Sequence, residues 1–432
     1  MIDLLFRRTL TLALVLGLGI VSPTLARAER PKDEVLEWNA VLRTALVSPL
    51  NTPPISAPAQ FRIAAIVHTA IFDALNGIER RYTPIHVTAE APRGASRRAA
   101  VVQAAYTTLL ALAPASSALY DQQLEASLAE IAARPAVENG ESIERGRAWG
   151  LQVAEEILAW RAGDGFNPPA PPYLGSAAPG KWRPTPAAFS PGLLPSLANT
   201  LPFVIPSTAD YRPADPPSLT SAAYVADFDE VKEIGELTSA VRTADQAEAA
   251  RFWNGTAMTF WNRAAESAAI RRHTTLSENA RLFALLNTAM ADGIISAWAA
   301  KYHYEYWRPI TAIRLASTDG NPGTEEQADW TPLVGTPPYP EYPAGHPTIS
   351  GAGQAVLTSF FGDQLPVEGT SEGLPGVVRS WPSFSAVADE ANLARIWAGI
   401  HFRTAVVSGR AAGDAIGLYV VEHVAQPVHI GD

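Results

Sequence analysis

Long alanine- and leucine-rich stretches with helical spacing constrain the fold of this 432-residue chain more than any other feature. Apolar residues recur in them every three to four positions, which is the spacing of a helix with one buried face. These stretches cover residues 35–47, 58–78, 95–133, 141–162, 220–268, 277–307, 347–360 and 386–425. Convincing strand-like alternation is hard to find, so we expect an all-α fold.

Two irregular segments interrupt this helical pattern. Between Gly165 and Pro217 the composition changes to proline, glycine and small residues, and paired prolines bar a regular helix. We therefore expect a long crossover that ends an N-terminal helical half, residues 29–217, and leads to a C-terminal half, residues 218–432. A second irregular segment, residues 318–347, is long enough to predict a loop that carries function.

The first 28 residues have the pattern of an export signal. Arg7-Arg8 precedes an apolar run, Leu10–Val21, and Ala26-Arg27-Ala28 fits a small-x-small cleavage site. The apolar run is shorter than the roughly 20 residues that a membrane span needs, which favours export over an anchor. The mature chain is then expected to begin near Glu29 in the periplasm or outside the cell, and the arginine pair leaves twin-arginine export open.

Charge and cysteine content exclude several classes of function. The net charge is −10, and the first 28 residues carry three arginines against one aspartate, so the mature chain would have a charge of −12. Nucleic acid is therefore not an expected partner. The lack of cysteine excludes disulfides, thiolate nucleophiles and iron–sulfur clusters. We also expect no segment after residue 28 to contain enough uninterrupted apolar residues to span a bilayer.

The first cluster of charged residues ends the predicted helix 277–307. A proline after Arg308 predicts the helix end near Trp307. Lys301 and Arg308 are seven residues apart, so both would share a helical face about 10 Å apart along the axis, with Glu305 between them. One interpretation is a solvated helix C-terminus that favours cations. The other is a pair of buried cations, which the crowding of aromatic residues in this segment favours.

A second cluster lies where the irregular segment 318–347 meets the next helix. Pro347 is well placed as the first helical residue. A helix N-terminus offers free backbone N–H groups to an anion, and Gly345 would allow close approach. His346 would lie at this end and could donate or accept a proton. A histidine near a turn is more often structural or solvated, so that alternative stays open.

The third cluster is the segment Arg395–His401, which contains Gly399. An uninterrupted helix would rotate His401 about 120° away from Arg395. Convergence of the two side chains therefore requires a helix break near Gly399 or the long reach of the arginine. The alternative is a partly buried histidine beside a surface arginine.

Taken in order, the motifs K-x6-R-P, P-A-G-H and R-x3-G-x-H resemble the signature shared by vanadium-dependent haloperoxidases and type-2 phosphatidic acid phosphatases. Upstream segments are also similar to bacterial haloperoxidase-like proteins: His68–Asn76, Arg242–Gln246, Phe252-Trp253 and Ala291-Asp292. The resemblance implies two four-helix bundles around an oxyanion pocket. This fold agrees with the helical pattern.

The resemblance also implies a role for each residue. Vanadate would be the cofactor, held by Lys301, Arg308, Arg395 and the backbone N–H of Gly345. His401 would be the vanadium ligand, or would bond to phosphorus in a phosphatase. His346 would be the general acid and base, and Lys301 would polarise hydrogen peroxide. The expected products are hypohalous acid from halide and peroxide.

Two positions depart from the family pattern. Ala344 stands where the family often has serine, so one hydroxyl donor to the oxyanion is missing, worth roughly 1.5 to 3 kcal/mol. Ala405 stands where the family often has an aspartate, four residues after the ligand histidine. Asp414 is about 19 Å from His401 along a helix and cannot replace it. Because phosphatases depend on that aspartate, its absence favours a haloperoxidase.

Three functions compete on this basis: an exported haloperoxidase, an exported acid phosphatase that acts on phosphate esters, and a degenerate oxyanion-binding protein. Vanadate should activate the first and inhibit the second. His68 and Asp73 are interpreted as packing and hydrogen-bonding residues. The aromatic residues Tyr339, Tyr342 and Trp307 would line the substrate entrance or belong to the core.

Overall fold

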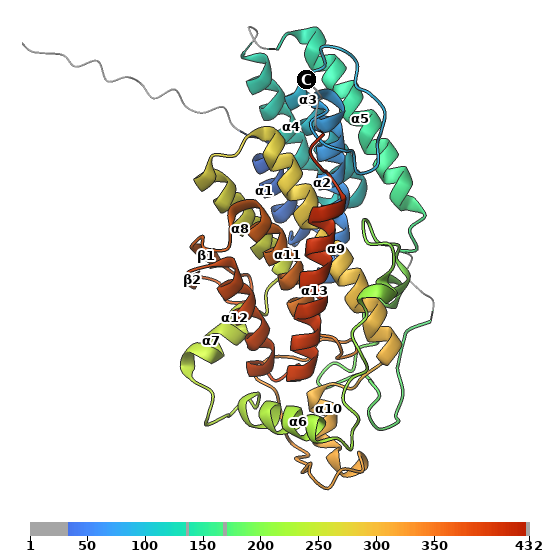
Figure 1. Ribbon diagram of the computed structural model, residues 1–432, viewed down its shortest axis with the longest axis vertical. Coiled ribbons are helices and arrows are strands. Elements are labelled where there is room, and N and C mark those ends of the chain that lie inside the picture. Colours follow the sequence, from blue (N-terminus) through green and yellow to red (C-terminus); the bar gives the residue numbers. More distant parts are fainter. Residues whose placement is uncertain (1–32, 135–137, 167–170, 429–432) are drawn as a thin grey trace, which may run out of the picture. The chain divides into compact units, whose positions relative to one another are not determined.

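Helices dominate the computed structural model, which describes residues 33–134, 138–166 and 171–428 (Figure 1). The N-terminal helices are α1 (Glu34–Leu46), α2 (Ala57–Glu79), α3 (Arg97–Leu112), α4 (Ser117–Ala132) and α5 (Gly140–Ala162). The later helices are α6 (Ala222–Ile234), α7 (Ala244–Phe252), α8 (Ala257–Arg272), α9 (Leu276–Tyr304), α10 (Pro309–Arg314), α11 (Gly345–Phe361), α12 (Phe384–Trp397) and α13 (Arg403–His423). The predicted all-α class is confirmed. The predicted export signal lies outside the described residues.

Some secondary structure was not predicted. An antiparallel hairpin of β1 (Val367–Thr370) and β2 (Val378–Trp381) lies between α11 and α12. In the described residues, short 3₁₀ turns occupy Pro114–Ser116, Pro195–Asn199, Thr208–Tyr211 and Ala316–Thr318. Three predicted stretches are each divided into two or three helices. Pro114 accounts for one division, because a proline ring cannot be accommodated inside an α-helix.

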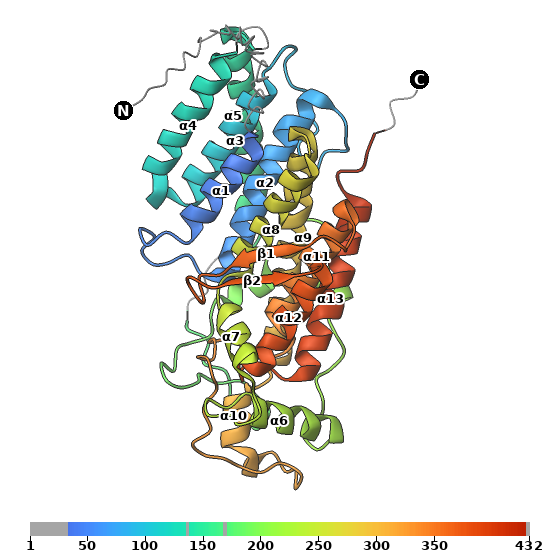
Figure 2. The same ribbon diagram turned by 90° about the vertical axis from the view of Figure 1, so that its left-hand side faces the viewer.

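The helices form two packed groups, which Figure 2 shows from the side. In the first group α2, α3 and α5 pack together, with α1 and α4 against α3. In the second group α11 packs against α8, α9, α12 and α13. The long helices α2 and α9 contact each other and join the groups, and one hydrophobic core runs through both. Asp33–Asp432 forms one compact unit, so the division near residue 217 stays a prediction.

Helices α2 and α9 meet the length and composition of a membrane span, although neither has the uninterrupted apolar run on which the expectation rested. Both are long and apolar enough by length and composition, and α3 with α4 would also qualify together despite a 120° bend. Within α2 and α9, 89% and 94% of the qualifying segments are buried inside the structure. Their apolar residues therefore pack against neighbouring helices.

Two buried aspartates attach irregular segments to these central helices. Asp73 on α2 accepts hydrogen bonds from three consecutive backbone N–H groups, those of residues 85–87. Asp292 on α9 does the same for residues 203–205, at 2.6, 2.8 and 2.9 Å. Each carboxylate thus accepts hydrogen bonds from backbone N–H groups that have no partner in a helix or strand. His68, also on α2, stacks on Phe283 and lies 3.3 Å from the side-chain oxygen of Asn39.

Replacing Asp292 by asparagine should destabilise the fold. An amide offers one acceptor oxygen where the carboxylate offers two, so at least one buried N–H of residues 203–205 loses its partner, at about 1–3 kcal/mol. Urea denaturation should show this loss in the free energy of unfolding. Asp414→Asn is the matched control, because Asp414 pairs with Arg410 in a partly exposed ion pair that contributes little. Equal stability of Asp292→Asn and wild type would contradict the anchoring role.

Candidate functional site

The structure brings the three predicted clusters together in the C-terminal half of the chain. Lys301, Arg308, Arg395 and His401 are buried, and His346 is half-buried. A guanidinium nitrogen of Arg308, Nη1, lies 3.1 Å from Nε2 of His401. The charges of Lys301, Arg308 and Arg395 all act on His401, whose pKa lies well below its ordinary value because of burial first and these cations second. The roles assigned to these residues stay predictions.

The first cluster is built differently from its prediction. Helix α9 ends at Tyr304, and Glu305 follows in the left-handed conformation with φ 53°. Arg308 lies beyond the helix, in extended backbone at the start of α10. The prediction that Lys301 and Arg308 share a helical face, with Glu305 between them, was therefore wrong. The carboxylate of Glu305 instead accepts from the hydroxyl of Tyr173 and lies 3.5 Å from Lys181.

Backbone carbonyl oxygens replace water around the buried cations. The ammonium of Lys301 donates to the carbonyls of Pro340 and Glu341 at 2.8 and 2.7 Å. Arg308 donates to the carbonyls of Tyr339 and Ile400, both at 2.8 Å. Arg395 donates to the carbonyl of Trp253 at 2.7 Å. The irregular segment 318–347 thus supplies three of these five acceptors, consistent with its interpretation as a functional loop.

The aromatic ring of Tyr339 adds to this solvation. Its centre lies 5.2 Å from the ammonium of Lys301 and 4.7 Å from the guanidinium carbon of Arg308. Both distances are within the range of cation–π attraction. Tyr339 therefore stabilises two of the cations with its ring while its carbonyl binds Arg308.

Two donors at the site have no acceptor within the described part of the chain. Nη2 of Arg308 and Nε of Arg395 are buried and unpaired. A buried donor without a partner costs free energy, and a charged one costs more. Burial also lowers the pKa of Lys301 well below its usual value and that of Arg395 to about 10. The unpaired N–H groups of Arg308 and Arg395 are therefore free to bind an anion.

The balance of charge points to the same conclusion. Against three cations the described chain places one carboxylate, that of Glu341, whose burial raises its pKa to about 8. No group of three or more histidine, cysteine, aspartate or glutamate residues that could hold a metal cation occurs among the described residues. A tetrahedral oxyanion such as vanadate or phosphate fits this set of donors, and a bare metal cation does not.

Helix α11 contributes backbone donors to the site. It begins at Gly345, two residues before the predicted start, with Ala344 as its N-cap. The first N–H groups of a helix have no partner within the helix, so those of Gly345 and His346 are available. A Cβ atom at Gly345 would lie 3.5 Å from the Trp298 ring and 3.9 Å from Cε of Lys301. Glycine thus keeps open the space beside Lys301 that an anion would need.

His346 is placed for proton transfer. Its Nε2 lies 3.3 Å from the carbonyl oxygen of Gly255. Because a carbonyl only accepts, Nε2 carries the proton and Nδ1 is the free acceptor. Desolvation first, and then the charges of Arg395 and Lys301, lowers the pKa of His346 to about 3. The imidazole is therefore neutral while the cations are uncompensated, and an anion that neutralises them would raise its pKa and make it a better proton acceptor.

A break in the helix brings the third cluster together. Helix α12 ends at Trp397, and Gly399 adopts φ +76° before α13 begins at Arg403. Of the two routes to convergence, the structure shows the break. A Cβ at Gly399 would overlap the carbonyl oxygen of Gly235 and lie 2.9 Å from Cβ of Pro332. Glycine is required here both by the backbone angle and by the close approach.

Sequence reasoning missed Glu341. This residue is fully buried, and its carboxylate oxygen Oε1 lies 2.9 Å from Nδ1 of His401. The signal was present as an acidic residue five positions before His346, inside a loop already expected to carry function. The sequence pattern does not predict that this loop packs against the segment before α13.

A cavity of about 230 Å³ leads to the site. Gly345, His346 and Arg395 line its polar end. Apolar and aromatic residues line the rest, including Phe61, Leu193, Ile294, Trp298, Pro337, Pro338 and Tyr339. Of the three aromatic residues expected at the entrance, Tyr339 lines this cavity, whereas Tyr342 and Trp307 belong to the core.

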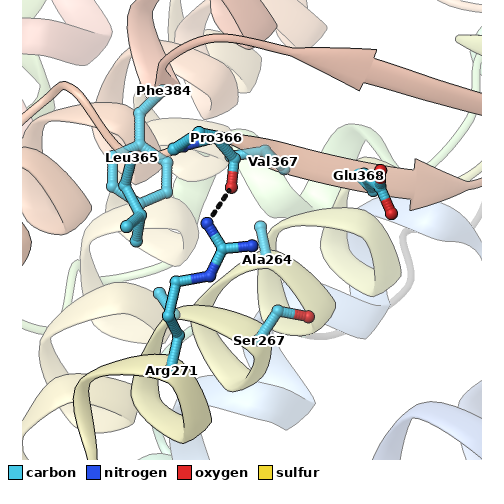
Figure 3. A pocket seen from close by; sticks show the side chains of 9 residues that line it. Ala264, Ser267, Arg271, Leu365, Pro366, Val367, Glu368 and Phe384 are labelled. Atoms are coloured by element: carbon cyan, nitrogen blue, oxygen red, sulfur yellow. Dashed lines mark hydrogen bonds between the residues drawn. The ribbon is translucent and has the colours of Figure 1, made fainter.

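A second hollow, at the surface between α8 and β1, carries no such chemistry (Figure 3). Arg271 points across it and donates to the carbonyl of Pro366 at 3.3 Å. Its lining contains none of the predicted site residues.

Comparison with known proteins gives the following relationships. Residues 281–429 match the family described as the VCPO second helical-bundle domain. The chain is 28% identical over 185 residues to the vanadium chloroperoxidase of Curvularia inaequalis, a match that covers 35% of this chain and 30% of that protein. The chain therefore spans less than a third of this relative's length.

Solved structures extend the likeness over most of the chain. A bacterial vanadium-dependent iodoperoxidase is 27% identical with a TM-score of 0.76, over 90% of this chain and 97% of that one. The apo and holo forms of a bacterial vanadium-dependent chloroperoxidase are 17% and 18% identical, with TM-scores of 0.67 and 0.66. These matches cover 85% and 91% of this chain, and 92% and 96% of those chains. At that identity they support the fold alone.

Replacing Gly399 by alanine should disrupt the site and destabilise the fold. The positive φ costs about 1–2 kcal/mol for any other residue, and the overlap with Gly235 adds about 1–3 kcal/mol. Gly320→Ala is the matched control, because Gly320 has φ +74° but open space around its missing Cβ. Thermal unfolding should show a clearly larger loss of stability for Gly399→Ala. Equal losses in the two variants would mean that the close approach to Gly235 contributes nothing.

Proposed function

We propose that the chain is a vanadium-dependent haloperoxidase, which oxidises halide ions with hydrogen peroxide to hypohalous acid and uses vanadate as its cofactor. The activities of the vanadium chloroperoxidase and the iodoperoxidase to which the chain is similar support this proposal. Export to the periplasm or the cell exterior is part of the proposal and rests on the first 28 residues.

The observation that carries the proposal is the excess of buried positive charge. Three cations surround the imidazole of His401, and two of their N–H groups are buried without partners in the described chain. Vanadate would be held by Lys301, Arg308, Arg395 and the N–H of Gly345, with His401 bonded to vanadium. Bound vanadate would supply a Lewis-acidic vanadium centre that activates hydrogen peroxide, and vanadium would keep its oxidation state.

The chain's own residues would then do the following work. The cations neutralise the oxyanion, and their fixed carbonyl partners keep them in place, so no reorganisation is needed during reaction. His346 accepts a proton from peroxide at its free nitrogen, Nδ1. Lys301, held by two carbonyls, can polarise an oxygen of the bound substrate with its remaining N–H. The apolar wall of the cavity limits the access of water.

The activity is tested by oxidation of iodide and bromide with hydrogen peroxide, using the purified protein without residues 1–28. Activity should require added orthovanadate, and His401→Ala should reduce it at least 100-fold because the covalent attachment is lost. His303→Ala is the control, because His303 lies in the last turn of α9 and outside the site. Absence of halide oxidation with saturating orthovanadate would contradict the proposal.

The phosphatase alternative is decided in the same preparation. Turnover of p-nitrophenyl phosphate without vanadium, and its inhibition by orthovanadate, would move the assignment to a phosphate-ester hydrolase. Neither activity would leave a protein that binds oxyanions only.

Replacing Ala344 by serine should strengthen vanadate binding. Ala344 is the buried N-cap of α11 and has no side-chain hydrogen bond to offer. A hydroxyl there would donate to the oxyanion and should lower the dissociation constant roughly tenfold, or about 1.4 kcal/mol. Calorimetric titration with orthovanadate measures the change. Ala355→Ser, about 16 Å further along α11, is the control, and an unchanged affinity of Ala344→Ser would contradict the account.

A further inference from the structure

We propose that Glu341 is the positioning residue of His401 and performs the task of the aspartate that is absent at position 405. Glu341 would fix which nitrogen of the imidazole carries the hydrogen, and the consequence for vanadate rests on the function proposed above. The His401 ring has two contacts on opposite sides. Nε2 of His401 lies 3.1 Å from Nη1 of Arg308, and Nδ1 lies 2.9 Å from Oε1 of Glu341.

The contact with Arg308 determines the role of Nε2. A guanidinium only donates hydrogen bonds, so Nε2 must be the acceptor and carries no proton. The neutral ring then has its hydrogen on Nδ1, which donates to Glu341. This tautomer leaves the lone pair of Nε2 on the side of the cations, where the oxyanion would bind. The opposite tautomer would place an N–H against Arg308 and could not form a bond to vanadium or phosphorus.

The acceptor role of Glu341 is fixed by a second donor. The backbone N–H of Phe402 also donates to Oε1, at 2.9 Å. Because Oε1 accepts from both neighbours, any proton on this carboxyl group would reside on Oε2. The side chain therefore holds the histidine and the following backbone as one unit, just before α13 begins.

The backbone of Glu341 ties the same residue to the cations. Its carbonyl accepts from Lys301 at 2.7 Å, and its N–H donates to the carbonyl of Tyr306 at 2.9 Å. One residue thus orients Lys301 through its main chain and His401 through its side chain. A shift of the 318–347 segment would disturb both groups together.

Position 405 shows why the carboxylate must come from elsewhere. Ala405 is fully buried in an apolar cluster with Ala344 and Phe402, and its carbonyl accepts from the N–H of Ala344. No carboxylate on α13 was expected to reach His401, and the structure provides one from the loop before α11. The missing aspartate is therefore no argument against histidine nucleophilicity, and it does not separate a haloperoxidase from a phosphatase in this chain.

The test measures the tautomer and the binding of orthovanadate separately. Long-range ¹H–¹⁵N spectra of the histidine-labelled protein, with His401 assigned from the signals lost in His401→Gln, report which ring nitrogen carries hydrogen. We expect hydrogen on Nδ1 in wild type and in Glu341→Gln, whose amide oxygen can accept from both donors. Glu341→Ala should populate the other tautomer and raise the dissociation constant for orthovanadate about 10- to 100-fold. Glu341→Gln should lose much less, and Glu230→Gln, which removes a surface partner of Arg403, should change neither readout.

Two results would overturn the proposal. One is hydrogen on Nε2 of His401 in the wild-type protein, which requires no variant to fold. The other is a Glu341→Ala variant with the wild-type tautomer and an affinity within about twofold of wild type. If Glu341→Ala does not fold, the wild-type and Glu341→Gln spectra still decide. If wild type binds orthovanadate in the expected tautomer but oxidises no halide, the proposed function fails and this assignment stands.

Discussion

The burial of three cations beside one histidine is the constraint on which the rest of this site depends. Removing an ammonium or guanidinium from water costs several kcal/mol for each ion unless other polar groups replace the water. Backbone carbonyls provide part of that replacement, and they come from segments of irregular structure that can aim them at the cations. One carboxylate is too little to balance the charge. An anion in the pocket would supply the missing negative charge. The stability of the site therefore depends on whether an anion is bound.

The scaffold accounts for the precision of this arrangement. The long buried helix α9 fixes Lys301, and the break at Gly399 ends the helix that carries Arg395 and turns the chain before His401, close enough for the charge of Arg395 to act on the imidazole. The same elements give the cavity two different ends. Polar groups lie at one end, and apolar side chains line the rest of the wall. Such a pocket presents fixed dipoles and charges to an oxyanion in a region of low dielectric, where each interaction is stronger than in water.

Sequence patterns predicted the helices well and the local geometry of the site poorly, for physical reasons. Helical periodicity depends on neighbours three and four residues apart, so α1, α2, α5 and α11 were predicted within about two residues at both ends, whereas the breaks inside three longer stretches were missed. The end of α9 depends on Glu305, which adopts a left-handed conformation and binds Tyr173 and Lys181 from the distant crossover. The ordered motifs predicted residues that the structure brings together, because the family resemblance carried spatial information. Glu341 was outside those motifs, and its contact with His401 spans 60 residues of chain.

A crystal structure of the protein soaked with orthovanadate tests the central claim most directly. The account predicts vanadium density within bonding distance of Nε2 of His401, with its oxygens near Nη2 of Arg308 and Nε of Arg395, the two donors without partners in the described chain. The anomalous signal of vanadium would identify the ion. Density at a surface site only, or an empty pocket at saturating orthovanadate, would contradict the conclusion that these cations are arranged to hold an oxyanion.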